Sequence, residues 1–457
     1  MPPVRARLGL LLLTGLVSGL APAQSGGLAE ADALAAKGLR ELGAYSMLGE
    51  LVNGIGPRSA GSKGAERAVK WGVATMRRLG LQNVREIPCT VRHWERGTLE
   101  SLNLRTGGRT ERLTLCALGN SVATPRSGIT AEVVEAESLA EIAALGERAR
   151  GKIVLLNAPM DPTLTDTFTA YGRAVGARSN GASEAAEVGA VGVLVRSMTL
   201  AHDDVPHTGA MRYAPDVAKI PAAALSVVAT ERLSAAIRRD PRARVTLRMN
   251  CRTLPDAPSA SVVGEIIGSE RPQEIVVVGG HLDSWDIAPG AHDDGAGVTQ
   301  SLEALRLLKE LGWRSKRTIR VVLFMNEENG GEGSRAVAAA LKASGETAYA
   351  AIESDSGGFA PRGFGCSLDA AGMAELAPWL PALSRFGIER FVAGGKGGAD
   401  IAALGDLGAI EFGLIPESQR YFDYHHTRID TVDKVNPREL ELGALSLAYL
   451  ALRLAER

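Results

Sequence analysis

The sequence of 457 residues has few cysteines, no excess charge of either sign and, beyond its first residues, no long apolar run. Four cysteines in so long a chain do not make a disulfide scaffold, and the lack of a C-x-x-C pair argues against a cysteine-based zinc site or redox dithiol. The 51 basic and 52 acidic residues balance, which removes the usual electrostatic case for a nucleic-acid partner. Any metal must therefore be held by histidine and carboxylate side chains.

The remaining composition is that of an ordinary globular protein. Hydrophobic residues make up 45% of the chain and charged residues 23%, which argues against a disordered, collagen-like or coiled-coil protein. The length suits about three average domains, or one large α/β unit with an insertion.

The first 23 residues have the pattern of a secretory signal peptide. Arg5 and Arg7 form a basic start, 8–20 is apolar, and the small residues at 21–23 suit cleavage before Gln24. The apolar run is shorter than the roughly 20 residues that span a bilayer, so we expect cleavage and no stable membrane insertion afterwards. The mature chain would be secreted or periplasmic, where three disulfide connectivities are open to Cys89, Cys116, Cys251 and Cys366.

The stretch before 119 and the stretch from 119 to 255 have different patterns. Helical spacing at 29–52 and 63–79 is followed by short strand-like segments to about 116. Within 119–255, apolar runs at 151–156 and 192–195, with a helix expected at 182–188, indicate a separate small α/β module. Pro255 and Pro258 predict a seam, that is, a domain boundary, at the end of this module.

The stretch from 256 to 457 alternates strand and helix patterns. Continuous apolar runs at 275–278, 319–324 and 348–352 predict buried strands, and the spacing over 298–308 predicts a helix. This alternation predicts an α/β fold with a mostly parallel, doubly covered sheet. With 24–118, it would form one discontinuous domain. Ligands of such sheets bind at the carboxyl ends of the strands.

Acidic and imidazole side chains follow each of these three strands. An acidic pair alone is usually a solvated surface, and a lone histidine is usually structural. Here, however, one sheet edge would collect them all, and crowded carboxylates repel one another unless a multivalent cation neutralises them. The residues concerned are His281, Asp283, Asp293, Glu327, Glu328, Glu353 and Asp355.

A second imidazole, His426, comes near the C-terminus within Tyr-His-His-Thr at 424–427. Zinc takes nitrogen and carboxylate ligands, and a pair of zinc ions needs one shared carboxylate and about two further ligands for each ion. Glu327 would remain as a base. The set that meets this count is His281, Asp293, Glu328, Asp355 and His426.

These residues resemble the site of a known superfamily. HLDSWD at 281–286, DDG at 293–295, EE at 327–328, ESD at 353–355 and HHT at 425–427 follow the order and spacing of the co-catalytic zinc exopeptidases of the aminopeptidase and glutamate carboxypeptidase type. The plasma glutamate carboxypeptidase branch is the most similar. Further matching segments, at 56–58, 61–63, 93–97, 151–154 and 206–209, extend the resemblance over nearly all of the mature chain.

The resemblance assigns a role to each of these residues. It implies that His281 and Asp355 hold one zinc ion, that Glu328 and His426 hold the other, and that Asp293 bridges the two. Glu327 would be the general base that activates a zinc-bridging water. Asp283 would orient the ring of His281. The module at 119–255 would be a protease-associated domain, and the enzyme would be a homodimer.

Two histidines have less certain roles. His425 occupies the position where related enzymes often have a tyrosine that helps to hold the oxyanion, and packing against the ligands is as open as catalysis. His292 stands where the most similar branch usually has an apolar residue, and it is expected to be a bystander, because Asp293 already supplies the bridge.

The sequence thus predicts a dizinc metalloexopeptidase that hydrolyses unblocked dipeptides or short peptides. An aminopeptidase that removes single N-terminal residues from longer peptides is the alternative. Two other classes, a non-catalytic binding ectodomain and a one-zinc glutaminyl cyclase, are disfavoured by the intact, duplicated ligand set. The residues that bind the substrate termini are left open, since Asp400, Arg420 and Asp423 are only near the site in the chain.

Overall fold

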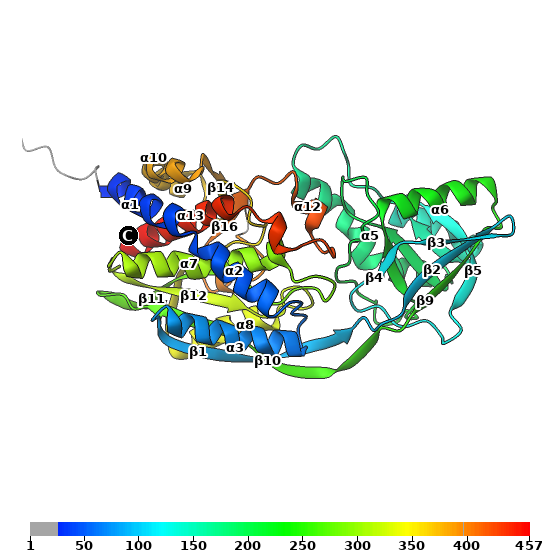
Figure 1. Ribbon diagram of the computed structural model, residues 1–457, viewed down its shortest axis with the longest axis horizontal. Coiled ribbons are helices and arrows are strands. Elements are labelled where there is room, and N and C mark those ends of the chain that lie inside the picture. The colour runs from blue at the N-terminus through cyan, green and yellow to red at the C-terminus, as the bar shows by residue number, and fades with distance from the viewer. Residues whose placement is uncertain (1–25, 396) are drawn as a thin grey trace, which may run out of the picture.

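The computed structural model describes residues 26–395 and 397–457, and the predicted signal peptide at 1–23 lies outside this part of the chain. The molecule is elongated and contains two eight-stranded sheets, one in each of two lobes (Figure 1). We refer to residues 100–249 as the second lobe and to the rest of the described chain as the first lobe.

The first sheet is parallel at its centre and antiparallel towards its edges. The prediction of a mostly parallel sheet is confirmed for the four central strands, whereas the next strand on each side runs antiparallel to them. In order across the sheet, the strands are β1 (Gln82–Glu95), β10 (Arg252–Ile266), β12 (Arg317–Phe324), β11 (Arg271–His281), β13 (Thr347–Glu353), β16 (Ile410–Pro416), β14 (Pro361–Cys366) and β15 (Arg390–Ala393).

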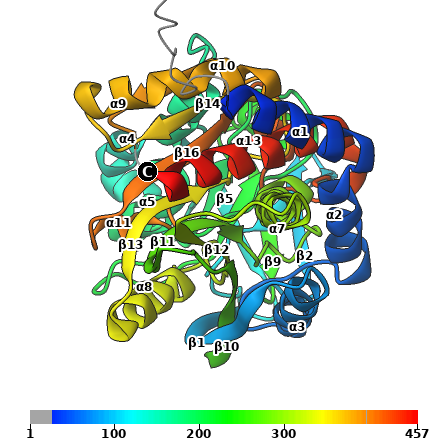
Figure 2. The same cartoon turned by 90° about the vertical axis from the view of Figure 1, so that its left-hand side faces the viewer.

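Helices cover both faces of this sheet, as predicted (Figure 2). One core joins the sheet to α1 (Gly26–Glu41), α2 (Gly43–Gly54), α3 (Lys63–Arg78), α7 (Ala296–Glu310) and α13 (Pro437–Glu456). A smaller core joins the opposite face to α8 (Glu332–Ser344) and α11 (Ala402–Gly405). The short helix α9 (Ala370–Leu376) packs beside β15, and α10 (Leu380–Leu383) packs beside α1.

The single helix predicted at 29–52 is two helices. Leu42, between α1 and α2, has a φ of 51° in the left-handed region, which ends one helix and redirects the chain into the next. The helix predicted at 63–79 matches α3.

The second lobe is a sheet covered by helices on both faces. Residues of α4 (Leu139–Leu145) and α5 (Thr167–Glu187) pack on one face and those of α6 (Val227–Arg239) on the other. The segment expected as a helix at 182–188 is the end of the longer α5. The strand order is β3 (Arg109–Leu113), β2 (Glu100–Thr106), β9 (Arg244–Met249), β5 (Ile129–Ala136), β6 (Ile153–Leu156), β7 (Gly192–Arg196), β8 (Ala222–Leu225) and β4 (Leu115–Ala117).

The second sheet starts earlier in the chain than the module expected at 119–255. β2, β3 and β4 all precede residue 119, yet β2 pairs with β9, β4 pairs with β8, and β3 joins the sheet through β2. The sequence did not reveal this, because the pairing partners of β2 and β4 lie more than a hundred residues further along the chain.

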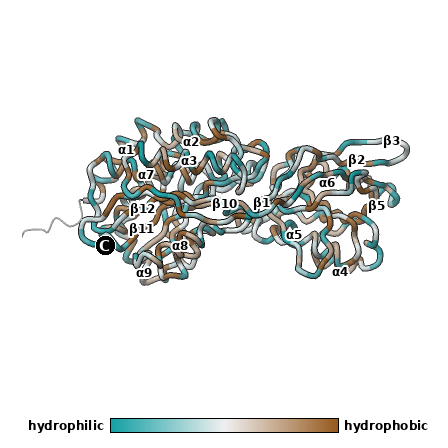
Figure 3. The backbone as a smooth tube through the Cα atoms, turned by 90° about the horizontal axis from the view of Figure 1, so that it is seen from below, coloured by the Kyte–Doolittle hydropathy of each residue, from teal (hydrophilic) through white to brown (hydrophobic). Residues whose placement is uncertain are grey.

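A two-stranded antiparallel ribbon carries the chain between the lobes. β1 and β10 pair from Gln82 opposite Glu265 to Glu95 opposite Arg252, and they run along the narrow waist of the molecule (Figure 3). Pro255 and Pro258, where the sequence predicted a seam, lie inside β10 and within this ribbon. Proline fits there since this part of β10 pairs with β1 on one side only.

The four cysteines are free, so none of the three connectivities left open by the sequence is formed. Cys116, Cys251 and Cys366 are buried, and Cys89 is half-buried. Among the described residues, no helix is both long and apolar enough to cross a membrane.

Candidate metal centre and active site

The carboxyl ends of the four central parallel strands meet at one edge of the first sheet. His281 ends β11, Glu327 and Glu328 follow β12, and Asp355 follows β13. β16 leads through α12 (Tyr421–Tyr424) to His426. The structure thus brings together every residue that the sequence predicted as a metal ligand or base.

Asp293 lies between the two histidines. Its Oδ1 is 3.1 Å from Nε2 of His281, and its Oδ2 is 3.2 Å from Nε2 of His426. Asp355 Oδ1 is 3.5 Å from the same nitrogen of His281, and Glu328 Oε2 is 3.0 Å from that of His426. Two histidine–carboxylate groups therefore share one aspartate, which is the arrangement that a bridging ligand requires.

Backbone carbonyls orient both imidazole rings. Nδ1 of His281 lies 3.1 Å from the carbonyl oxygen of Asp283, and Nδ1 of His426 lies 3.2 Å from that of Thr208. A carbonyl oxygen only accepts hydrogen bonds, so in the neutral rings Nδ1 carries the proton and Nε2 keeps its lone pair. Each lone pair then faces Asp293, ready to bind a metal.

Two acidic residues outside the predicted set hold the turn that carries Asp293. Asp430 accepts the backbone N–H groups of His292 at 2.7 Å and Asp293 at 3.1 Å. Asp294 accepts the N–H groups of Gly297 at 2.8 Å and His281 at 3.0 Å. The peptide bond between Asp293 and Asp294 is cis. Sequence reasoning missed both roles, since side-chain to backbone contacts leave no pattern of their own.

Asp283 contacts both the ring of His281 and the turn that carries Glu327. Its side chain is fully buried, and Oδ1 lies 3.8 Å from Nδ1 of His281, near the ring that it was predicted to orient. The hydrogen bond to that ring comes from its backbone carbonyl. Its carboxylate accepts the N–H groups of Asn326 at 2.6 Å and Glu327 at 3.1 Å, so Asp283 also fixes the turn that presents Glu327.

Another buried support is Arg58, from the Gly-Pro-Arg segment at 56–58. Its guanidinium donates to the carbonyl oxygens of Leu282 at 2.7 Å and Gly290 at 3.2 Å. Burial lowers its pKa to about 10, and it remains a cation at neutral pH. It holds the loop between His281 and Asp293 in place.

The electrostatics of the site favour the binding of a cation. Burial and then Asp293 raise the pKa of Glu328 to about 7, and burial raises the pKa of Asp355. Burial alone would lower the pKa of both histidines, but Asp355 raises that of His281, and Glu328 that of His426, well above the usual value. These carboxyl and imidazole groups therefore hold protons that offset the repulsion among the carboxylates. A bound cation would replace those protons.

The residues present suit zinc. Oε1 of Glu328 and Oδ1 of Asp355 are buried and accept no hydrogen bond from the described residues. Two groups of ligand atoms, each lying within 4.8 Å of one another, share Asp293: one with His281 and Asp355, the other with His425 and His426. Nitrogen and carboxylate donors without sulfur fit catalytic zinc.

His425 packs against the ligands. Its ring stacks on that of His426 with a centroid separation of 3.6 Å, and its Nε2 lies 3.8 Å from Oδ2 of Asp293. Burial and then His426 lower its pKa well below the usual value, so the ring is neutral. It meets Tyr171 of α5 edge to face, which links the metal centre to the second lobe.

His292 is a structural residue, as its expected role of bystander implies. Its ring stacks on Phe359 with a centroid separation of 4.2 Å. Nδ1 accepts the N–H of Gly358 at 3.1 Å, and Nε2 lies 3.3 Å from the carbonyl oxygen of Lys434. Both ring nitrogens are thus occupied away from the metal centre.

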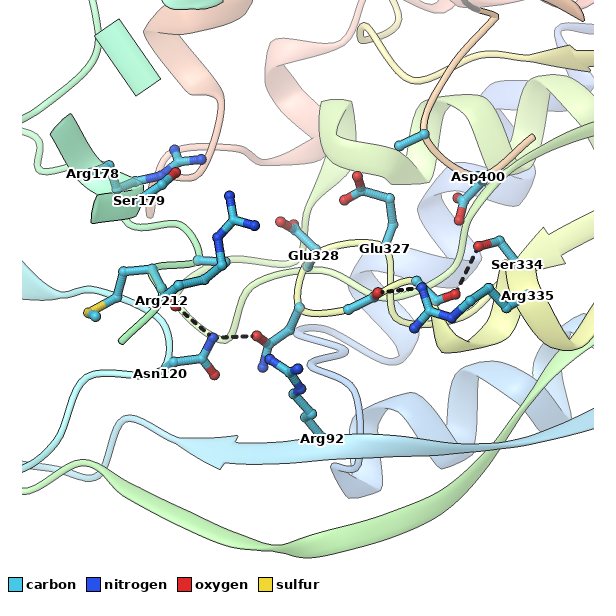
Figure 4. A pocket seen from close by; sticks show the side chains of 16 residues that line it. Arg92, Asn120, Arg178, Ser179, Arg212, Glu327, Glu328, Ser334, Arg335 and Asp400 are labelled. Atoms are coloured by element: carbon cyan, nitrogen blue, oxygen red, sulfur yellow. Dashed lines mark hydrogen bonds between the residues drawn. The ribbon is translucent and has the colours of Figure 1, made fainter. Parts of the chain in front are cut away.

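Two adjoining cavities open at the site. The first, of about 250 Å³, is lined by the metal-centre residues and by aromatic residues of α5 and α12. The second, of about 430 Å³, shares Glu327, Glu328 and Arg178 with it and is lined further by Arg92, Arg212, Arg335 and Asp400 (Figure 4). The sequence gave no signal for these arginines, because they come from three different elements and one loop.

Comparisons with known proteins agree with this geometry. The sequence profile described as peptidase family M28 matches residues 261–451. Carboxypeptidase Q of Bos taurus is 37% identical over 412 residues, which cover 90% of this chain and 85% of that protein. Carboxypeptidase Q of Homo sapiens is 35% identical over 423 residues, 93% of this chain and 87% of that protein.

Solved structures extend the likeness to the fold. The crystal structure of a peptidase M28 precursor from Shewanella amazonensis aligns with a TM-score of 0.90 and 33% identity, covering 94% of this chain and 97% of that one. A zinc aminopeptidase from Bacillus subtilis aligns with a TM-score of 0.63 and 22% identity, covering 89% and 94%. Both lobes are therefore part of an established architecture.

Proposed function

Because the chain belongs to peptidase family M28 and is a zinc-dependent metallopeptidase of that family, we propose that it is an exopeptidase that binds two zinc ions and hydrolyses unblocked dipeptides or short peptides. The observation that carries the proposal is the position of Asp293, with one carboxylate oxygen near each of two histidines. A single-ion site needs no such shared carboxylate.

The ligands divide into two groups around the shared aspartate. His281 and Asp355 would hold one ion, Glu328 and His426 the other, and Asp293 both. Zinc bound in this way polarises a substrate carbonyl and lowers the pKa of water. His425 and Asp283 are contacts of the ligand set and not ligands in this assignment.

Glu327 is the proposed general base. It lines both cavities beside Glu328, and Asp283 fixes its backbone. Burial, together with Asp355 and Glu328, raises its pKa well above the usual value. A carboxylate of raised pKa can take a proton from the attacking water and return it to the leaving amine. Glu328, committed to a metal, cannot do this.

We also propose the remaining organisation of the molecule. The second lobe would be a protease-associated domain inserted into the catalytic domain, over 100–249 and not 119–255. The mature protein would be secreted or periplasmic after loss of 1–23, and it would form a homodimer. Analytical ultracentrifugation and N-terminal sequencing of the exported protein test these two points.

The first test is hydrolysis of an unblocked dipeptide series by the purified mature chain, before and after chelation, with metal counted in the same sample. We expect two zinc ions per chain, loss of activity on chelation and recovery when zinc is added back. If the enzyme releases single N-terminal residues from long peptides as fast as it hydrolyses dipeptides, the aminopeptidase is favoured instead. Chelator-insensitive hydrolysis without bound metal would overturn the proposal.

A further inference from the structure

The larger cavity contains arginines that the proposed reaction does not use. Arg178 and Arg212 belong to the second lobe, whereas Glu327 and Glu328 belong to the first (Figure 4). A peptide bound over the metal centre must therefore lie against both lobes. Arg178 and Arg212 bring cationic groups from the second lobe, and Arg92 and Arg335 bring them from the first.

Arg178 is a buried cation with unused hydrogen-bond donors. Only 9% of the residue is exposed, and no carboxylate of the described chain forms an ion pair with it. One terminal nitrogen donates to the Tyr171 hydroxyl at 2.7 Å, while Nε is buried without a partner. The other terminal nitrogen lies 3.4 Å from Nδ1 of His426, which already faces the carbonyl of Thr208. Buried donors without acceptors are costly, and an incoming anion would satisfy them.

Arg212 completes the cationic side. Its backbone is held against α5, since its N–H donates to the Ser179 carbonyl at 3.0 Å and its own carbonyl accepts from the Ser183 hydroxyl at 3.3 Å. Its side chain is exposed to the cavity and forms no ion pair within the described chain. Arg335, by contrast, is already paired with Glu332 at 3.1 Å.

The far end of the same cavity is acidic. Asp400 is 1% exposed, and neither of its carboxylate oxygens has a hydrogen-bond partner among the described residues. In Figure 4, Asp400 and the two arginines lie on opposite sides of Glu327 and Glu328. A cavity with arginines at one end and a buried carboxyl group without partners at the other suits a zwitterion that lies across the reacting groups.

We propose that Arg178 and Arg212 form a subsite for the C-terminal carboxylate of the substrate, one residue beyond the scissile bond, and so select dipeptides over longer chains. This inference rests on the proposed function. One residue spans about 3.5 Å, and Arg178 lies next to His426, a proposed zinc ligand. Planar guanidinium groups bind carboxylates with two parallel hydrogen bonds. A longer peptide would bring an uncharged amide and further residues to this position.

The test compares L-alanyl-L-leucine with its C-terminal amide in the zinc-loaded enzyme. The wild type should have a kcat/KM at least about tenfold higher for the free acid. Arg212→Gln should lower kcat/KM for the acid by roughly ten- to a hundredfold, the effect of one lost charge-assisted hydrogen bond, and change that for the amide by less than about twofold. Arg212→Lys should recover part of the loss. Arg148→Gln, an exposed arginine of the same lobe outside the cavity, serves as the control.

A binding measurement separates this inference from the proposed function. Calorimetry with the Glu327→Gln protein should give tighter binding of the acid than of the amide, and Arg212→Gln in that background should remove the difference. If the wild type cleaves acid and amide equally well, the subsite is wrong and the peptidase assignment stands. If no peptide is cleaved but calorimetry still favours the acid, the subsite stands and the proposed reaction is wrong.

Discussion

Neighbouring glutamates differ in role because their side chains face different partners. Glu328 Oε2 lies 3.0 Å from His426 within the proposed metal centre. Glu327 faces the cavities, and its backbone is held by Asp283. A single step along the chain thus separates the proposed ligand from the proposed base.

We expect Glu327→Gln to keep two zinc ions and to lower kcat by about 10²- to 10⁴-fold, the usual contribution of a general base. Glu328→Gln should lose metal, because it removes a ligand. Metal counting by mass spectrometry beside steady-state kinetics checks both variants. Near-normal turnover in the Glu327 variant would show that the base is another group.

Much of the site could be predicted from the sequence, and the reason is topological. Parallel strands bring their carboxyl ends together, so residues such as His281 and Asp355, each at a strand end, had to be neighbours. Asp430 and Arg178 reach the site through loops and through the other lobe. Their positions depend on contacts between distant segments, for which one sequence contains no periodic signal.

At the level of elements, α7 approaches the sheet edge so closely that a side chain is excluded. A Cβ on Gly297 would overlap the carbonyl oxygen of Ser354 and crowd Asp294. In α2, a Cβ on Gly49 would meet no atom within 4 Å. A side chain is therefore excluded at position 297 and would be accommodated at position 49.

Gly297→Ala should destabilise the protein by about 1–3 kcal/mol or more through overpacking, and it should weaken zinc binding, because the Asp293 turn precedes this helix. Gly49→Ala is the matched control and should stabilise by about 0.5–1 kcal/mol, since alanine favours a helix. Urea unfolding at constant zinc concentration measures both. A stable, zinc-binding Gly297 variant would contradict the close approach.

Another contact between elements gives a pH dependence of stability. Glu441 of α13 accepts the N–H of Ala44 in α2 at 3.2 Å, and burial together with Glu303 raises its pKa to about 9 from 4.5. The folded state therefore holds a proton that the unfolded state releases, so this group stabilises less and less as the pH rises from 4.5 to 9.

Glu441→Gln keeps the shape and removes the titration. We expect the variant to gain stability relative to the wild type as the pH rises from about 5 to 9, with melting temperatures measured in parallel buffers. Two profiles that stay parallel over this range would mean that Glu441 titrates near its ordinary pKa in the folded protein.

The sequence predicted elements well where burial alone defines them and poorly where long-range pairing does. The apolar run at 319–324 became part of β12 because a central strand is buried on both faces. Burial alone does not predict where β10 begins. Its prolines are typical of a loop, and only the pairing with β1 makes them part of a strand. Leu42 gave no turn signal either.

At the level of the whole molecule, the metal centre joins the lobes. His426 belongs to the first lobe, but the carbonyl of Thr208 in the second lobe orients its ring, and Phe168 of α5 stacks on Tyr421 of α12 at 5.2 Å. Bound zinc should thus stabilise both lobes and not only the site.

Chelation should therefore lower the melting temperature by several degrees. Free zinc at a hundred times its Kd raises the free energy of unfolding by about 2.7 kcal/mol, because unfolding disperses the ligands and the unfolded chain no longer binds the ion. Differential scanning calorimetry with and without chelator is the measurement, and Glu328→Gln, with weaker metal binding, should respond less. An unchanged melting temperature in the wild type would contradict a resident metal.

The ribbon of β1 and β10 has a consequence for engineering. Because Glu95 lies directly opposite Arg252, the chain leaves for the second lobe and returns at neighbouring points, much as a hairpin does. A tight turn could replace everything between them and leave the first sheet's hydrogen bonds intact, and the excised lobe could be grafted onto another antiparallel pair. The substrate contacts of the second lobe would then be exchangeable as a cassette, provided that the replacement again presents a backbone carbonyl to His426 as Thr208 does.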